Sequence, residues 1–140
     1  MQRYAVRRHI AAPPERVWAA LTDPAVLTAG TGITRLDGAP GPGARFRLWA
    51  EVSGARGFAI RVRAWEPPGF MLWESGMPFG LFRGRRSFRL AAAGAGTDFA
   101  MDEVFSGVLA GPICRSMPDL TPSFEQFAGA IARAAEGGQT

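Results

Sequence analysis

Residues 119–136 read DLTPSFEQFAGAIARAAE, and their apolar side chains recur at steps of three and four. That spacing gathers side chains on one stripe of an α-helix. Thr121 suits the N-cap with Pro122 at the first helical position, and Gly137-Gly138 ends the pattern. Because two phenylalanines on one stripe need a broad apolar surface to pack against, we expect this helix to lie on a sheet. The stripe consists of Leu120, Phe124, Phe127, Ala128, Ile131 and Ala135.

The middle of the chain can supply that sheet, because several segments alternate between apolar and polar residues. These segments are 3–11, 33–37, 45–52, 58–65, 70–75, 83–92 and 97–105. Alternation predicts a concave face that includes Phe46, Leu48, Val52, Ile60 and Val62. It predicts a convex face that carries Arg45, Arg47, Trp49, Arg61, Arg63 and Trp65. Several strands followed by one long helix indicate an α+β fold with the helix on one face of the sheet.

Two short helices are predicted between the first two strands. Pro14-Glu15-Arg16 opens a helix that turns Val17, Trp18 and Leu21 inward, and Asp23-Pro24 ends it. Residues 24–30 form a second helical turn. Further along, the uncharged segment 76–82 suits either a loop folded over an apolar opening or ordinary packing.

Length and composition place all of this in one domain, residues 1–140. A hydrophobic fraction of 47% is typical of a folded chain. No uncharged run approaches the ~18 apolar residues that a membrane-spanning helix needs. The first residues, MQRYAVRRHIAA, lack the continuous apolar core of a signal peptide, so we expect a cytoplasmic protein.

Several kinds of chemistry are disfavoured by what the chain lacks. Cys114 is the only cysteine and His9 the only histidine, so neither a metal site nor a nucleophile activated by histidine is expected. All 16 basic residues are arginine, which excludes a lysine Schiff base and a phosphate-loop lysine. No cofactor is expected. The arginines are spread along strand-like segments, so the net charge of +4 does not predict specific nucleic-acid binding.

The segment 10–24, IAAPPERVWAALTDP, resembles the opening of the START/Bet v 1-like (SRPBCC) superfamily, in particular its polyketide cyclase/dehydrase-like members. Residues 77–84, MPFGLFRG, and the later Phe88, Leu90 and Glu103 also fit. The resemblance implies a helix-grip fold, in which a curved antiparallel sheet of about seven strands wraps around a long C-terminal helix. It implies two short helices after strand 1 and a cavity between sheet and helix.

Aromatic and aliphatic side chains on the inward faces either fill a core or line that cavity. With the resemblance, we predict that they bind a small hydrophobic molecule that is lipid-like, aromatic or polyketide-like. The predicted ligand-binding residues are Phe46, Leu48, Ile60, Val62, Trp73, Phe79, Phe82, Phe88, Phe99, Met101, Phe105, Phe124, Phe127 and Ile131.

The alternation of side chains along two strands also places two charged residues on the inner face of the sheet. Arg86 shares a face with Phe88, and Glu103 shares a face with Met101 and Phe105, so both should point inward and contact each other or a shared water or ligand. The pair could be an ion pair at the mouth of the cavity with no chemistry. One alternative is therefore a polyketide cyclase or dehydratase in which Glu103 is the general acid or base and Arg86 polarises a carbonyl. A second alternative, implied by chaperone-activating members of the superfamily, is a non-catalytic regulator that binds another protein through its exposed sheet, with Trp49 and Trp65 as anchors. The sequence indicates no oligomeric state.

Overall fold

The computed structural model describes residues 2–137. Strand β1 (Gln2–Ile10) leads into helices α1 (Pro14–Leu21) and α2 (Pro24–Leu27). Six strands follow, and these are β2 (Ile33–Asp37), β3 (Arg45–Ala50), β4 (Gly57–Glu66), β5 (Phe70–Gly76), β6 (Arg83–Ala93) and β7 (Gly96–Ser106). Short 3₁₀ turns lie at Glu51–Ser53 (η1) and Pro78–Gly80 (η2), and the chain ends in α3 (Ala110–Ser116) and α4 (Thr121–Gly137).

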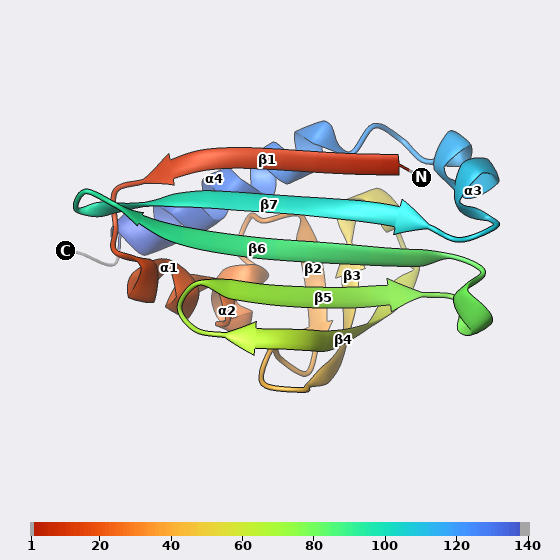
Figure 1. Cartoon of the computed structure of the whole chain (residues 1–140), viewed down its shortest axis with the longest axis horizontal. Helices are drawn as coiled ribbons and strands as arrows, with labels where there is room; N and C mark the ends of the chain where they lie inside the picture. Colours follow the sequence, from red (N-terminus) through yellow and green to blue (C-terminus); the bar gives the residue numbers. More distant parts are fainter. Residues whose placement is uncertain (1, 138–140) are drawn as a thin grey trace.

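All seven strands form one antiparallel sheet in the order β1-β7-β6-β5-β4-β3-β2. The first two strands therefore lie at opposite edges, and α1 and α2 connect them. Figure 1 shows α4 passing behind β1 and β7, with β2 and β3 curled round to the same side of the sheet. This arrangement confirms the predicted α+β helix-grip fold.

The core lies between the concave face of the sheet and α4. Phe124, Phe127 and Ile131 of α4 are buried, as predicted, and Phe127 lies 6.0 Å from Phe88 of β6 between ring centroids. The predicted inward residues of α1, including Val17, are buried in the same core. The helix is thus held by the apolar stripe that its sequence predicts.

Helix α4 begins one residue earlier than the predicted N-cap implies. Thr121 is already helical, and its backbone N–H donates to Oδ1 of Asp119 at 3.0 Å. This backbone hydrogen bond holds the pKa of the fully exposed Asp119 carboxyl below its usual value of 3.8, and a side-chain hydrogen bond from Thr121 acts in the same direction. Asp119, not Thr121, therefore satisfies the first free N–H of the helix.

Strands β3 and β4 confirm most of the predicted facing. Phe46, Leu48, Ile60 and Val62 are buried, and the four arginines assigned to the convex face are exposed. The prediction for Val52 is wrong: β3 ends at Ala50, and Val52 lies on η1 with 49% of its surface exposed. The hydroxyl of Ser53 bonds the backbone of Ala50 and turns the chain out of the strand.

The prediction for Trp65 is also wrong. The β4–β5 register shifts between Val62 and Ala64, which places Trp65 opposite the buried Met71. Its ring meets that of Trp18 on α1 edge to face, at 5.0 Å. A β-bulge adds one residue to a strand and so reverses the alternation beyond it, turning Trp65 inward.

Candidate functional site

Four polar side chains form a line across the inward face of the sheet, one from each of four adjacent strands. The strand register pairs Trp73 with Arg86, Arg86 with Glu103, and Glu103 with Tyr4. Because directly paired residues point to the same face of a sheet, all four face α4. We call Tyr4, Glu103, Arg86 and Trp73 the inner polar row.

Arg86 and Glu103 are in contact, as parity predicted. Nε and Nη2 of Arg86 donate to Oε1 of Glu103 at 3.2 and 2.8 Å. The guanidinium also lies 4.8 Å from the ring centroid of Phe124 on α4. The exposed fraction is 21% for the Arg86 side chain and 11% for that of Glu103, so solvent reaches part of the pair.

The second carboxylate oxygen of Glu103 occupies the space left by a glycine. A Cβ on Gly84 would stand 3.0 Å from Oε2 of Glu103 and 3.1 Å from the ring of Phe105. Both hydrogen bonds from Arg86 end on Oε1, and no hydrogen bond within residues 2–137 ends on Oε2. Glu103 therefore retains an acceptor for another molecule.

Trp73 adds a donor that has no protein partner among the described residues. Its side chain is 2% exposed, and its ring packs between Phe46 at 5.2 Å and Phe88 at 4.7 Å. The buried Nε1–H of Trp73 makes no hydrogen bond in the described part of the chain. An unsatisfied buried donor costs about 1–3 kcal/mol, so this group is suited to an acceptor on a bound molecule or water.

Tyr4 was not predicted as a site residue. Its ring lies 6.3 Å from Phe105 and 6.0 Å from Phe124. The signal that could have identified it is the pairing of β1 with β7, which is not visible in the sequence of either strand alone. Tyr4 brings a phenolic hydroxyl to the end of the row beside Glu103.

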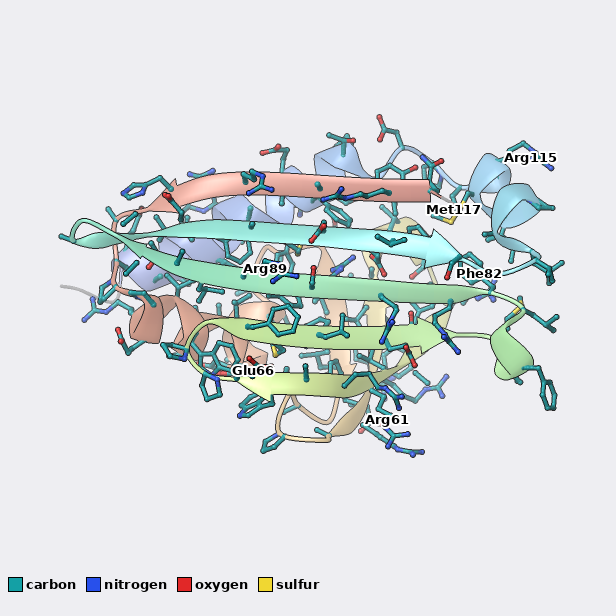
Figure 2. The ribbon with its side chains drawn as sticks, viewed as in Figure 1. Arg61, Glu66, Phe82, Arg89, Arg115 and Met117 are labelled. Carbon is teal, nitrogen blue, oxygen red and sulfur yellow. The ribbon has the colours of Figure 1, made fainter. Side chains whose placement is uncertain are left out.

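All the predicted ligand-binding residues except Phe79 and Phe82 are buried. Phe82 is half-buried and stacks on Phe105 at 5.5 Å, at the end of the sheet shown in Figure 2. Phe79 differs, because 96% of its surface is exposed and its backbone has φ = 61°. This left-handed conformation is rare for a bulky residue, and here the ring extends into solvent instead of covering an opening.

The rings of Trp73, Phe88 and Phe127 pack in sequence at the centre of the helix–sheet layer. A concavity of about 620 Å³ lies elsewhere, where β3 to β6 meet the loop after β5. Its lining includes the outward-facing Arg47, Arg61 and Glu74. Phe46, Ile60 and Phe82 of the predicted ligand-binding set also border it, but no residue of α4 does, so it is not the predicted space between sheet and α4. The inner polar row and the arginine-lined concavity are separate features.

Neither a metal cluster nor a membrane-spanning helix is present in the part of the chain that the structure describes. No three His, Cys, Asp or Glu side chains of residues 2–137 lie together as metal ligands. No helix in the same range is long and apolar enough to cross a bilayer.

Comparison with known proteins gives one family. The sequence model described as "Polyketide cyclase / dehydrase and lipid transport" matches residues 1–136. No sequence among curated proteins matches the chain.

Solved structures share the fold. Protein MLL2253 from Mesorhizobium loti is 23% identical with a TM-score of 0.75, and the match covers 97% of this chain and 98% of that one. Ara h 8.0201 is 17% identical with a TM-score of 0.65, covering 98% and 96%. DynU16, a putative protein in the dynemicin biosynthetic locus, is 21% identical with a TM-score of 0.71, and the match covers 99% of this chain but 48% of DynU16. These likenesses establish the Bet v 1-like helix-grip fold.

Proposed function

This chain belongs to the polyketide cyclase/dehydrase and lipid transport family, and from that premise we propose that it binds a small hydrophobic molecule on the inner face of the sheet. The molecule is lipid-like, aromatic or polyketide-like, and its polar group meets the inner polar row. The aromatic residues around the row, such as Phe105 and Phe124, contact its apolar part.

The observation that carries this proposal is the Arg86–Glu103 ion pair on an inner face that consists mainly of apolar side chains. Placing charges among aromatic rings costs desolvation energy that well-packed apolar residues would avoid. Ligand sites combine apolar walls with a few polar groups that fix orientation, and the row has this composition. The guanidinium of Arg86 and Nε1 of Trp73 can donate to a carbonyl, while Oε2 of Glu103 can accept from a hydroxyl.

The proposal is tested by titrating the purified protein with the fluorescent probe 1-anilinonaphthalene-8-sulfonate, an aromatic anion, after native mass spectrometry has shown whether a ligand is retained. We expect Arg86→Met to weaken probe binding about tenfold, because it removes a charge-assisted donor. Arg3→Met is the matched control, since Arg3 pairs with Asp102, the residue next to Glu103, on the outer face.

Equal binding by the two variants would contradict the proposal. Thermal unfolding of both must first show a cooperative transition, because the probe also binds partly folded chains. If Arg86→Met does not fold, Trp73→Phe provides a second test. It keeps a ring and removes the unpaired donor, and it should weaken probe binding without loss of folding.

The free oxygen of Glu103 favours one second candidate, a cyclase or dehydratase acting on a polyketide-like substrate. Oε2 would take a proton from the carbon next to a carbonyl, and Arg86 would stabilise the enolate oxygen. Glu103→Gln should then abolish product formation, followed by mass spectrometry on a polyketide substrate, while probe binding is kept. Binding without turnover by the unchanged protein would reject this candidate and leave the binding function standing.

A further inference from the structure

Strand pairing collects a strongly basic patch on the outer face of β3 to β6. The register sets Arg45 opposite Arg61, Asp37 opposite Arg47, and Glu74 opposite Arg85. Six arginines and two carboxylates share this patch, so it carries the same formal charge as the whole chain, +4. The rest of the chain has no net formal charge. We call Arg45, Arg47, Arg61, Arg63, Arg83 and Arg85 the arginine patch.

Carboxylates inside the patch neutralise little of it. Glu74 is shared by three arginines, with N–O distances of 3.0 Å to Arg85 and 3.8 Å to both Arg63 and Arg83. Within the described residues, no ion pair involves the remaining three arginines of the patch. The patch therefore presents unpaired positive charge to solvent. In Figure 2, Arg61 projects from the lower edge of the molecule, and other nitrogen-tipped side chains gather beside it.

One end of the molecule also exposes large apolar side chains from two loops. Phe79 is 96% exposed and Val108 is 78% exposed. The loops are tied together, since the N–H of Leu109 donates to the carbonyl of Leu81 at 2.9 Å, and a Cβ on Gly107 would stand 2.6 Å from that same oxygen. In Figure 1, the β5–β6 connection and α3 lie at this end of the sheet. We call Met77, Phe79, Leu81, Val108 and Leu109 the apolar tip.

The arginine patch and the apolar tip are continuous. Both border the concavity of about 620 Å³, whose lining includes Arg45, Arg61 and Arg83 from the patch and Met77 and Phe79 from the tip. Apolar side chains next to unpaired arginines match the two layers of an anionic membrane surface. Acyl chains accept the apolar groups, and lipid phosphates attract the arginines. A uniformly polar partner such as a nucleic acid would leave the apolar tip without a contact.

We propose that this surface docks on a lipid bilayer that contains anionic lipids. The apolar tip enters the headgroup region, and the arginine patch lies against the phosphates. Docking of this kind requires no molecule on the inner face of the sheet. The proposal therefore goes beyond ligand binding and does not rest on it.

The test is flotation of the full chain with vesicles of phosphatidylcholine, alone or mixed with phosphatidylglycerol. We expect binding only to the mixed vesicles, and weaker binding as salt is raised. Phe79→Asn should weaken binding about tenfold, because it removes the most exposed apolar group and asparagine accepts a left-handed backbone. Val52→Ser is the matched control, since Val52 is an exposed apolar residue outside the tip.

The arginine patch is tested separately. Arg61→Gln should weaken binding to the mixed vesicles about fivefold, the effect of one basic residue near a charged membrane. Arg7→Gln on β1, an exposed arginine outside the patch, should leave binding unchanged.

Three results would overturn the proposal: no binding to mixed vesicles, equal binding to neutral and mixed vesicles, or full binding by Phe79→Asn. Sedimentation velocity distinguishes the main rival occupant, a second copy of this chain. If the protein does not bind vesicles but forms a dimer, and Phe79→Asn converts that dimer to a monomer, the surface serves self-association instead.

Discussion

Arg86 directs both Nε and Nη2 to a single oxygen of Glu103, at 3.2 and 2.8 Å. A guanidinium fork more often meets both oxygens of a carboxylate, one N–H to each. Here Phe124 lies under the guanidinium and Gly84 leaves room for the second oxygen, so the carboxylate is turned with Oε2 away from the arginine. The pair is thus held by one oxygen and open at the other.

This pair should contribute measurably to stability. We expect Glu103→Ala to lower the free energy of unfolding by about 2 kcal/mol, below the value for a sealed ion pair because solvent reaches Arg86. Urea denaturation of Glu103→Ala, Arg86→Ala and the double variant gives the coupling energy. The exposed Arg3–Asp102 pair is the control and should couple by less than about 1 kcal/mol. Equal coupling in the two pairs would contradict the inward placement.

Trp73→Phe should be nearly neutral for stability despite the loss of buried volume. Removing the indole N–H relieves an unsatisfied donor, worth about 1–3 kcal/mol, and this offsets the lost packing. Urea denaturation should place the variant within about 1 kcal/mol of the unchanged protein. Trp73→Ala is the comparison and should lose about 3–5 kcal/mol. If Trp73→Phe also loses about 3–5 kcal/mol of unfolding free energy, the indole N–H has a partner such as an ordered water.

The inward turn of Trp65 predicts a difference between two tryptophans. Trp65→Ala removes a ring that packs on Trp18, so we expect a loss of about 3 kcal/mol. Trp49 lies on the outer face under the guanidinium of Arg35, at 4.6 Å, and Trp49→Ala should cost about 1 kcal/mol. Chemical denaturation compares the two. A larger loss of unfolding free energy for Trp49→Ala than for Trp65→Ala would contradict the inward placement of Trp65.

Asp119 predicts a pH dependence at the start of α4. Its pKa in the folded chain lies below 3.8 because the carboxylate accepts from Thr121, so folding favours its charged form. The stabilisation is complete above the unfolded pKa near 3.8 and disappears as the pH falls through the lower folded value. Asp119→Ala should therefore be less stable than the unchanged protein at neutral pH, and the gap should close in strong acid. The free energy of unfolding of both proteins is measured by urea denaturation at several pH values. A difference between them that does not change with pH would contradict this prediction.

Alternation was sufficient where a strand is regular and its turn is short. Arg86 and Glu103 lie on the two arms of a hairpin that turns at Gly94-Ala95, so the turn sets the register and parity sets the face. Alternation within each strand also placed Phe46 and Ile60 correctly, although the connection between β3 and β4 is longer. Both arms of the β6–β7 hairpin run without a bulge from the turn to the Arg86–Glu103 pair, so the alternation of side chains is kept.

The predictions are wrong where a single residue reverses the alternation of a strand or adopts an unusual backbone conformation. A bulge after Val62 reversed the facing of Trp65, and a single left-handed residue sent Phe79 into solvent. Helix α3 was not predicted, because the Gly111-Pro112 dipeptide within it is typical of a loop. The arginine patch and the place of Tyr4 depend on register between several strands, which no single segment of sequence contains.

The sheet order has a consequence for how the chain folds during synthesis. Strand β1 is made first, yet its partner is β7, with Gln2 opposite Phe105 and Ile10 opposite Thr97. Residues up to β7 must leave the ribosome before β1 can pair, so the hydrogen-bonding edge of β1 stays open until β7 emerges. Closing so long a loop is slow. We expect the pairing of β1 with β7 to be rate-limiting, and a nascent chain caught before it to be the form most prone to aggregation.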